Sequence, residues 1–226
     1  MKKISKFLSE LAANNNRDWF LEHKAQADAA KAEFTQLVEY LIADSNDFIP
    51  GLAQFEAKDL IYRLNRDVRF SKDKTPYNPT FRALLSGQGK KVLGAGYFFG
   101  IDGEGQAFVG SGFHMSDSKE AVAAIRENLV KDASLVLEFD KKYKIAGDAL
   151  KKLPAGFEMQ ADSALAELLK HKSWHIETHL DLSALTTKDA AHALAKEFKA
   201  MSPFVDWLNN ALTEVKAPEK KKGRRA

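Results

Sequence analysis

Apolar residues recur every three or four positions through the first 44 residues, the spacing of one buried face of an α-helix. Ile4, Phe7, Leu8 and Leu11 predict a first helix. It should end at residues 14–16, where three asparagine side chains compete for backbone hydrogen bonds. The same spacing over residues 19–44 predicts one long helix, and the Pro-Gly pair within residues 48–51 predicts its end.

The pattern then changes to alternation of apolar and polar residues, which is typical of strands. Alternation predicts strands over residues 59–70, 81–86, 94–101, 106–113 and 174–182. The separators between successive strands from residue 81 to 113 are short, and residues 102–105 carry an Asp-Gly hairpin signal. Short separators favour antiparallel pairing, because parallel strands need long crossover connections.

Helical spacing returns after residue 116. We predict helices over residues 116–129, 133–142, 162–170 and 188–213, with Ser116, Asp117 and Ser118 as candidate caps of the first and an interruption of the last at Ser202-Pro203. Together the elements predict the α+β class, with an antiparallel sheet covered by helices. We expect a single domain over residues 1–215.

Composition narrows the chemistry. The 226 residues include no cysteine, which excludes disulfides, thiolate nucleophiles and cysteine-ligated metal centres. No apolar run approaches the roughly 20 residues of a membrane span. Lys6, Ser9 and Glu10 interrupt the apolar part of a signal peptide. We therefore predict a cytoplasmic protein that does not bind membranes.

The net charge of +3 belongs to the end of the chain. Residues 216–226 hold six bases and one acid, so the preceding part of the chain is slightly acidic. With no large apolar side chain to bury, residues 216–226 are expected to form a disordered basic tail. Nucleic acid is a candidate partner of this tail.

Residues 63–77 are the densest in candidate chemistry, with five bases and two acids. Read as a strand, this segment sends Arg66 to the apolar face, where a buried charge needs a partner or a ligand. A carboxylate between guanidinium groups can hold their planar forks in place, which favours an anion cradle. The candidate ligand-binding residues are Arg63, Arg66, Asp67, Arg69, Lys72, Lys74, Tyr77 and, from the helix over residues 116–129, Arg126. No catalytic residue is assigned.

Three other patterns were weighed. His171, His175 and His179 are spaced by four, but alternation places His175 and His179 on a strand beside Glu177, and a solvated edge is favoured over a metal site. Residues 110–112 read Gly-Ser-Gly, one residue short on each side of a hydrolase elbow, and favour a close backbone approach or a bulge. Residues 87–91 lack the Gly-Lys-Ser/Thr of a P-loop. We predict no metal and no cofactor.

Several strings of the chain resemble the uncharacterised family called domain of unknown function 2461. They are Asn-Asn-Arg-Asp-Trp-Phe at residues 15–20, the whole of residues 63–77, Gly-Ser-Gly at 110–112, Ala-Ile-Arg at 124–126, Leu-Pro-Ala-Gly-Phe at 153–157 and Leu-Lys-His-Lys-Ser at 169–173. The resemblance covers most of residues 4–212. It implies one domain and marks residues 63–77, without implying an activity. The chain departs from the family after Gly112, where similar proteins usually enter a helix through a proline.

Two hypotheses of function follow. The first is an anion-binding domain, extended to an enzyme acting on a phosphorylated or carboxylated small molecule, with Asp67 orienting the bases or acting as a general base. The alternative is a nucleic-acid or protein binding module that uses residues 63–77 and the basic tail. The slightly acidic charge of residues 1–215 favours the first.

Overall fold

A computed structural model of the protein describes residues 1–90, 93–114 and 117–215. The helices in chain order are α1 (Lys2–Ala13), α2 (Arg17–Glu22), α3 (Lys24–Ser45), α4 (Ala57–Leu60), α5 (Lys119–Lys131), α6 (Ser134–Tyr143), α7 (Ala166–Lys170) and α8 (Thr187–Ala211). The strands are β1 (Phe81–Leu85), β2 (Gly96–Ile101), β3 (Gln106–Phe113) and β4 (Trp174–Asp181), which form one antiparallel sheet in the order β1-β2-β3-β4. The predicted α+β class is confirmed. The predicted basic tail, residues 216–226, lies outside the described residues.

The described chain divides between two compact units. The first unit holds residues 1–90, 96–111 and 177–202, and the second holds the other described residues. Three elements, β3, β4 and α8, contribute residues to both units. The single domain expected over residues 1–215 therefore stays a prediction.

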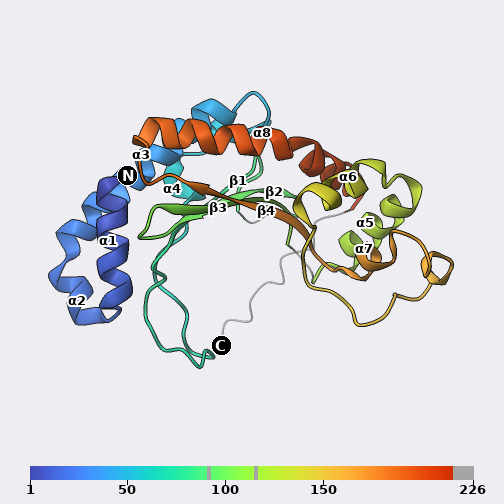
Figure 1. The fold of residues 1–226 in the computed structure, drawn as a ribbon, viewed down its shortest axis with the longest axis horizontal. Helices are drawn as coiled ribbons and strands as arrows, with labels where there is room; N and C mark the ends of the chain where they lie inside the picture. The colour runs from blue at the N-terminus through green and yellow to red at the C-terminus, as the bar shows by residue number, and fades with distance from the viewer. Residues whose placement is uncertain (91–92, 115–116, 216–226) are drawn as a thin grey trace, which may run out of the picture. The chain divides into compact units, whose positions relative to one another are not determined.

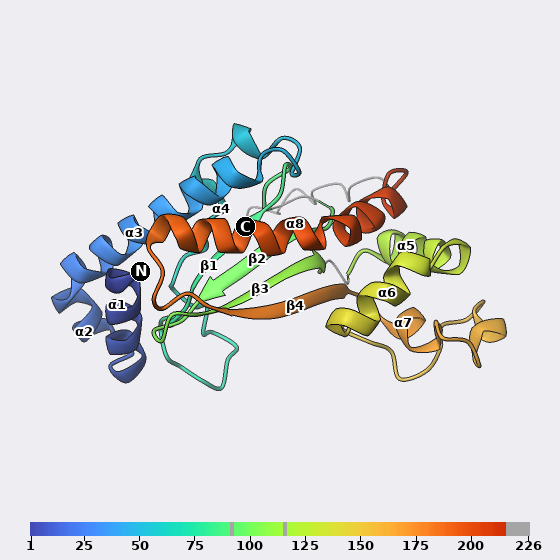
Figure 2. The same ribbon diagram turned by 45° about the horizontal axis from the view of Figure 1, so that its top comes forward.

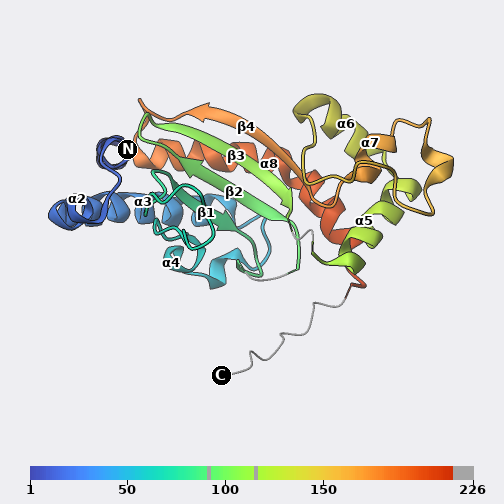
Figure 3. The ribbon, with the colours of Figure 1, turned by 90° about the horizontal axis from the view of Figure 1, so that it is seen from below.

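The core of the first unit lies between the sheet and two helices. Figures 1 and 3 show α3 and the first part of α8 on the same face of the sheet, and Figure 2 shows that part of α8 lying across the strands. The ring of Phe34 on α3 stacks on that of Phe81 on β1, with centroids 5.0 Å apart. Phe198 on α8 contacts Tyr97 on β2 at 5.2 Å. All four rings are buried, so the helical and alternating apolar patterns of the sequence meet here.

The single long helix predicted over residues 19–44 is wrong, because the chain breaks at His23 into α2 and α3. His23 leaves the helical conformation, with φ −102° and ψ 20°. Its ring stacks on that of Trp19 at 4.2 Å and its Nδ1 lies 2.8 Å from the Trp19 carbonyl oxygen. The backbone N–H of His23 donates to the same carbonyl at 3.0 Å, so α2 keeps its last helical hydrogen bond and ends at this residue.

The strand predicted over residues 59–70 is also wrong. Residues 57–60 form α4, and the chain after it makes isolated bridges at Ile61 and Asn65 rather than a strand. The limbs around residues 65 and 77 bond to each other, since Arg66 N–H donates to Pro76 O at 2.9 Å and Asn78 N–H donates to Leu64 O at 2.8 Å. The sequence alternates here as a strand would, because one side of the loop faces the protein: residues 64, 66 and 68 are half-buried, while residues 63, 65, 67 and 69 are exposed.

The remaining helix and strand predictions hold with two corrections. Of the predicted caps of α5, Ser116 lies outside the described residues, and Ser118 accepts from Ala121 N–H. Helices α5 and α6 and strand β4 lie where expected, but α7 covers only the end of residues 162–170. The predicted interruption at Ser202-Pro203 is wrong, because α8 continues through Pro203. Proline cannot donate to the Lys199 carbonyl four residues earlier, and the Ser202 hydroxyl donates to that carbonyl instead, at 3.0 Å.

Candidate ligand-binding site

Residues 63–77, here called the basic loop, project from the sheet away from α3 and α8 (Figure 1). Arg66 ties the two limbs of the loop together, because its guanidinium donates to the Asp73 carboxylate at 2.5 Å and also to the Thr75 hydroxyl. The hydrogen bond from Arg66, with those from Thr75, lowers the pKa of Asp73 to about 2. Arg66 thus has a counter-charge within the loop.

A second pair lies near the tip of the basic loop. The Arg69 guanidinium donates twice to Asp67, Nε to Oδ1 at 2.9 Å and Nη2 to Oδ2 at 2.6 Å. These hydrogen bonds hold the pKa of Asp67 below its ordinary value. An exposed carboxylate stabilised in its ionised form is a weak general base, so the geometry favours the orienting role expected for Asp67 over the catalytic one.

The other predicted residues of the loop differ in setting. Lys74 donates to the Val68 carbonyl at 2.9 Å, which caps the turn. Arg63 and Lys72 are exposed and pair with no carboxylate in the part of the chain that the structure describes. Tyr77 is buried, and its ring stacks on that of Phe20 at 4.2 Å. The loop therefore keeps a net positive charge after its two internal ion pairs form.

Asn15 fixes the basic loop to the N-terminal helices. Its side-chain amide donates to Tyr77 O at 2.9 Å and accepts from Tyr77 N–H at 3.1 Å, the pairing that a neighbouring strand would supply. The sequence predicts that the run of asparagines ends α1 and that one of them caps the next helix, which is confirmed because the Asn16 side chain accepts from Trp19 N–H at the start of α2. A double hydrogen bond between residues 62 positions apart leaves no signal in local spacing.

Two hollows flank the basic loop within the first unit. The α2 hollow, about 470 Å³, is lined by Asn15, Asn16, Arg17, Val68, Lys74, Thr75 and Pro76. The α3 hollow, about 250 Å³, is lined by Phe20, Lys24, Ala27, Asp28, Lys31, Ile61, Tyr62, Arg63, Leu64, Asn65 and Phe81. Of the eight residues predicted to bind a ligand, Arg63 lines the α3 hollow and Lys74 the α2 hollow. The structure does not bring all eight to one concave surface.

The α3 hollow combines cations with aromatic rings. Lys24 pairs with Asp28 on the next turn of α3, which leaves Lys31 and Arg63 without a carboxylate partner among the described residues. Tyr62, Phe20 and Phe81 supply aromatic surface. Burial raises the pKa of Tyr62 despite the nearby Arg82 cation, so its hydroxyl stays protonated and can donate. Lys24 and Lys31 were not among the residues predicted from the sequence.

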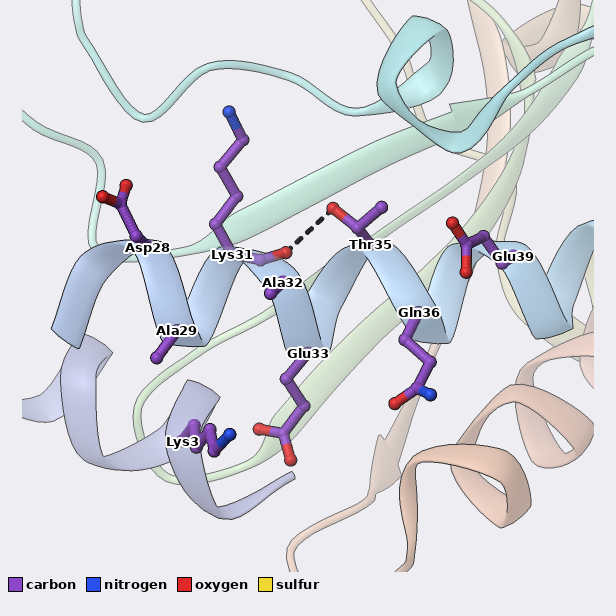
Figure 4. Close-up of a pocket in the computed structure, with 9 residues that line it drawn as sticks. All are labelled: Lys3, Asp28, Ala29, Lys31, Ala32, Glu33, Thr35, Gln36 and Glu39. Carbon is purple, nitrogen blue, oxygen red and sulfur yellow. Dashed lines mark hydrogen bonds between the residues drawn. The ribbon is translucent and has the colours of Figure 1, made fainter. Parts of the chain in front are cut away.

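A further hollow of about 590 Å³ runs along α3 (Figure 4). Figure 4 shows Asp28 and Lys31 on one side of the helix and Glu33 and Gln36 on the other, so the lining side chains diverge. Glu33 is already engaged by the Met1 amino group at 2.8 Å. Diverging groups of mixed charge do not converge on one ligand, and Lys31 also lines the α3 hollow.

Arg126, the eighth predicted residue, lies in the second unit. It is nine-tenths buried, and its Nη2 donates to the His171 carbonyl at 2.9 Å. Burial lowers its pKa. It forms no ion pair within the residues that the structure describes. Two strings that carry the family resemblance, around residues 126 and 171, thus meet in this unit.

The histidines of β4 and Ser111 of β3 were the residues considered for a metal site and for a nucleophile. On β4, His175 lies between the buried Trp174 and Ile176, whereas His179 is exposed between half-buried residues and lies 3.6 Å from Glu177. Within the described ranges, no group of three or more histidine, aspartate and glutamate side chains is placed to hold a metal ion. Ser111 is fully buried on β3, where a substrate cannot reach its hydroxyl. None of the described helices is long and apolar enough to cross a membrane.

Lowering the pH should destabilise the protein through His114. Its ring stacks on that of His175 at 4.8 Å, and burial followed by the charge of His175 lowers its pKa from 6.5 to about 4. The unfolded chain therefore binds more protons between these values, so the free energy of unfolding falls as the pH drops below about 6.5. Because the residue is partly exposed, we expect a loss on the order of 1 kcal/mol.

This pH effect can be measured by urea unfolding of the wild type and His114→Asn at about pH 7.5 and about pH 5. The wild type should lose more stability than the variant over this interval. Equal losses would show that the His114 ring titrates alike in the folded and unfolded chain.

These features define an α+β protein in which a basic loop is clamped to N-terminal helices beside a cationic, aromatic hollow. The chain belongs to the family of domain of unknown function 2461 (DUF2461), described as a conserved hypothetical protein, whose model matches residues 3–207. The resemblance inferred from the sequence is confirmed. No curated protein and no solved structure matches the chain.

Proposed function

We propose that the protein binds a small anionic molecule in the α3 hollow. The observation that carries the proposal is the pairing pattern of its cations. Three cations, Lys24, Lys31 and Arg63, line the hollow with one carboxylate, and that carboxylate is taken by Lys24. Like charges that share a hollow repel one another unless an anion joins them. A bound anion would bring Lys31 and Arg63 into ion pairs of their own.

The aromatic lining narrows the class of ligand. Phe20 is a half-buried ring in the wall of the hollow, and the protonated Tyr62 hydroxyl offers a donor. A planar guanidinium favours bidentate recognition of carboxylate or phosphate, which Arg63 would supply. A volume of about 250 Å³ lies below the usual range for drug-sized ligands. The proposed ligand is therefore a compact phosphorylated or carboxylated molecule with a flat or apolar part. The protein would bind it in the cytoplasm, the compartment that the sequence predicts.

Binding of such an anion is expected to raise the melting temperature of the native protein, because a ligand that binds only the folded state stabilises it by mass action. Phenyl phosphate carries both the anion and the ring, and inorganic phosphate carries the anion alone. We expect the larger gain with phenyl phosphate. At a concentration about 100 times its dissociation constant, the gain corresponds to about 2.7 kcal/mol.

Arg63→Ala and Lys31→Ala should each remove most of this gain. Lys72→Ala is the matched control, since Lys72 is an exposed cation of the same loop that lines neither hollow. Differential scanning calorimetry with and without each anion measures the effect, and isothermal titration gives the affinities. A gain that persists in Arg63→Ala and Lys31→Ala, or a wild type that responds to neither anion, would refute binding in the α3 hollow.

A further inference from the structure

Phe70 lies near the tip of the basic loop and is almost wholly outside the protein. Its exposed fraction is 96%, the highest of the large apolar side chains that the structure describes as exposed. An exposed apolar residue alone needs no explanation. Met159, for example, is 94% exposed in the second unit. What distinguishes Phe70 is the order and the charge of the chain around it.

The loop that carries Phe70 is held at several points. The Ser71 N–H donates to Val68 O at 3.3 Å, which closes a turn around Phe70. Lys74 caps the Val68 and Arg69 carbonyls, and Arg66 bridges to Asp73 on the opposite limb. The ring is therefore presented on an ordered turn, and a partner that binds it has less conformational entropy to overcome.

The charges beside Phe70 are mainly positive. The Arg69 guanidinium lies 5.8 Å from the centroid of the Phe70 ring and its side chain is 77% exposed. Lys72, two residues further on, is exposed and has no carboxylate partner among the described residues. Because the loop has five bases against two acids, it carries an excess of three positive charges. An aromatic face flanked by cations is complementary to a base flanked by phosphates.

We propose that the tip of the basic loop is a contact surface for single-stranded nucleic acid. A base stacks on the Phe70 ring, and the adjoining phosphates pair with Lys72 and with the N–H groups of Arg69 beyond the two that donate to Asp67. Bases that are already paired in a duplex do not offer their faces, so a single strand should bind better than a duplex of the same sequence. The contact does not depend on the α3 hollow, because Phe70 and Lys72 do not line it.

A single ring favours this partner over the two alternatives. One base needs only one aromatic face. Stable membrane attachment needs more buried apolar surface or a second anchor. A protein interface usually centres on a larger desolvated cluster. Around Phe70 the neighbouring apolar residue, Val68, is half-buried, and the rest of the turn is polar or charged.

The test uses the full chain, so that residues 216–226 contribute equally to every variant. Phe70→Trp adds an indole at the tip to the three tryptophans of the wild type. The emission that this variant has in excess of the wild type should be quenched when a thymidine oligonucleotide stacks on the new ring. Phe70→Ala should weaken binding of that oligonucleotide by about tenfold, from the loss of one stacked base. Met159→Ala is the control for removing an exposed apolar side chain and should bind as the wild type does. The slope of log affinity against log salt is negative, and Lys72→Ala should make it shallower by about 0.7, from the loss of one phosphate contact.

Three outcomes would overturn the proposal. Phe70→Ala could bind the oligonucleotide as tightly as the wild type, which would place any binding on charge alone. The Phe70→Trp indole could respond to vesicles of phosphatidylserine and phosphatidylcholine but not to the oligonucleotide, which would assign the tip to a membrane surface. The wild type could bind no oligonucleotide at low salt. None of these results bears on phenyl phosphate binding, so this proposal and that for the α3 hollow can fail separately.

Discussion

Replacing Gly112 by alanine is expected to lower the free energy of unfolding by about 2–4 kcal/mol. Gly112, on β3, has φ +151°, a conformation that residues with a side chain rarely adopt. A Cβ atom there would lie 2.2 Å from Trp174 O and 2.5 Å from the Cα of His175. Both atoms belong to the backbone of β4, so relief requires the strand to shift. The close approach expected for the glycines at residues 110–112 is realised at this position.

Gly156→Ala separates the clash from the backbone strain. Gly156 also has a positive φ, +88°, but a Cβ there would meet no atom within 4 Å. Its replacement should therefore cost only the strain, about 1 kcal/mol. Guanidinium unfolding of both variants measures the difference. Similar losses for the two would mean that β4 yields easily and that the approach of the strands at Gly112 contributes little.

Asn15→Ala should be the most damaging single change to the basic loop, with an expected loss of about 2 kcal/mol. The substitution removes both hydrogen bonds to the backbone of Tyr77 and leaves a partly buried N–H and C=O without their partners. An unpaired polar group of this kind costs more than the hydrogen bond contributed. The Tyr77 amide should also exchange its hydrogen faster, because the limb of the loop is released from the helices.

Asn15→Asp separates the contributions of the two hydrogen bonds between Asn15 and the backbone of Tyr77. A carboxylate still accepts from Tyr77 N–H, but it has no proton to donate to Tyr77 O and its charge is repelled by that oxygen. We expect a smaller loss of stability and a protected Tyr77 amide. Unfolding curves and hydrogen exchange at Tyr77 give both readouts. If Asn15→Ala left the exchange rate of Tyr77 unchanged, the loop would be held by the Phe20–Tyr77 stack rather than by Asn15.

The elements that could be predicted are those that local spacing determines. β3 lies at the predicted residues 106–113, and β1, β2, β4, α1 and α5 lie within a few residues of their predicted bounds, because each buries one face with a regular period. The strand predicted over residues 59–70 failed for a related reason. An irregular loop with one side against the protein also alternates in burial, and only backbone pairing distinguishes the two.

The two misplaced helix breaks lie at side-chain contacts that periodicity does not report. The ring of His23 stacks on Trp19 and lies 2.8 Å from its carbonyl oxygen, at the point where a helix ends that the apolar pattern would continue. The Ser202 hydroxyl supplies the donor that Pro203 lacks and maintains a helix that the proline would interrupt. Both effects depend on the rotamer of one side chain, which the type of residue alone does not determine.

The candidate site was predictable only in part. The density of charge in residues 63–77 was visible in the sequence, and Arg63 was named from it. Lys24 and Lys31 were not, because on α3 they belong to a polar face that is usually only solvated. Their grouping with Arg63 arises from the packing of α3 against residues 61–65, a tertiary contact that no local pattern encodes.

The division of β3, β4 and α8 between the two units has a consequence for synthesis of the chain. The first unit includes residues 177–202, which hold most of β4 and the first part of α8. Its other segments end at residue 111, so the unit stays incomplete until residues 177–202 have been synthesised. During translation, most of the second unit emerges before the first can be completed. We therefore expect that the first unit does not complete its folding ahead of the rest, which is the usual order for consecutive domains. Until β4 has been synthesised, the β3 edge has no partner strand, and we expect this unpaired edge to be a site of aggregation during synthesis.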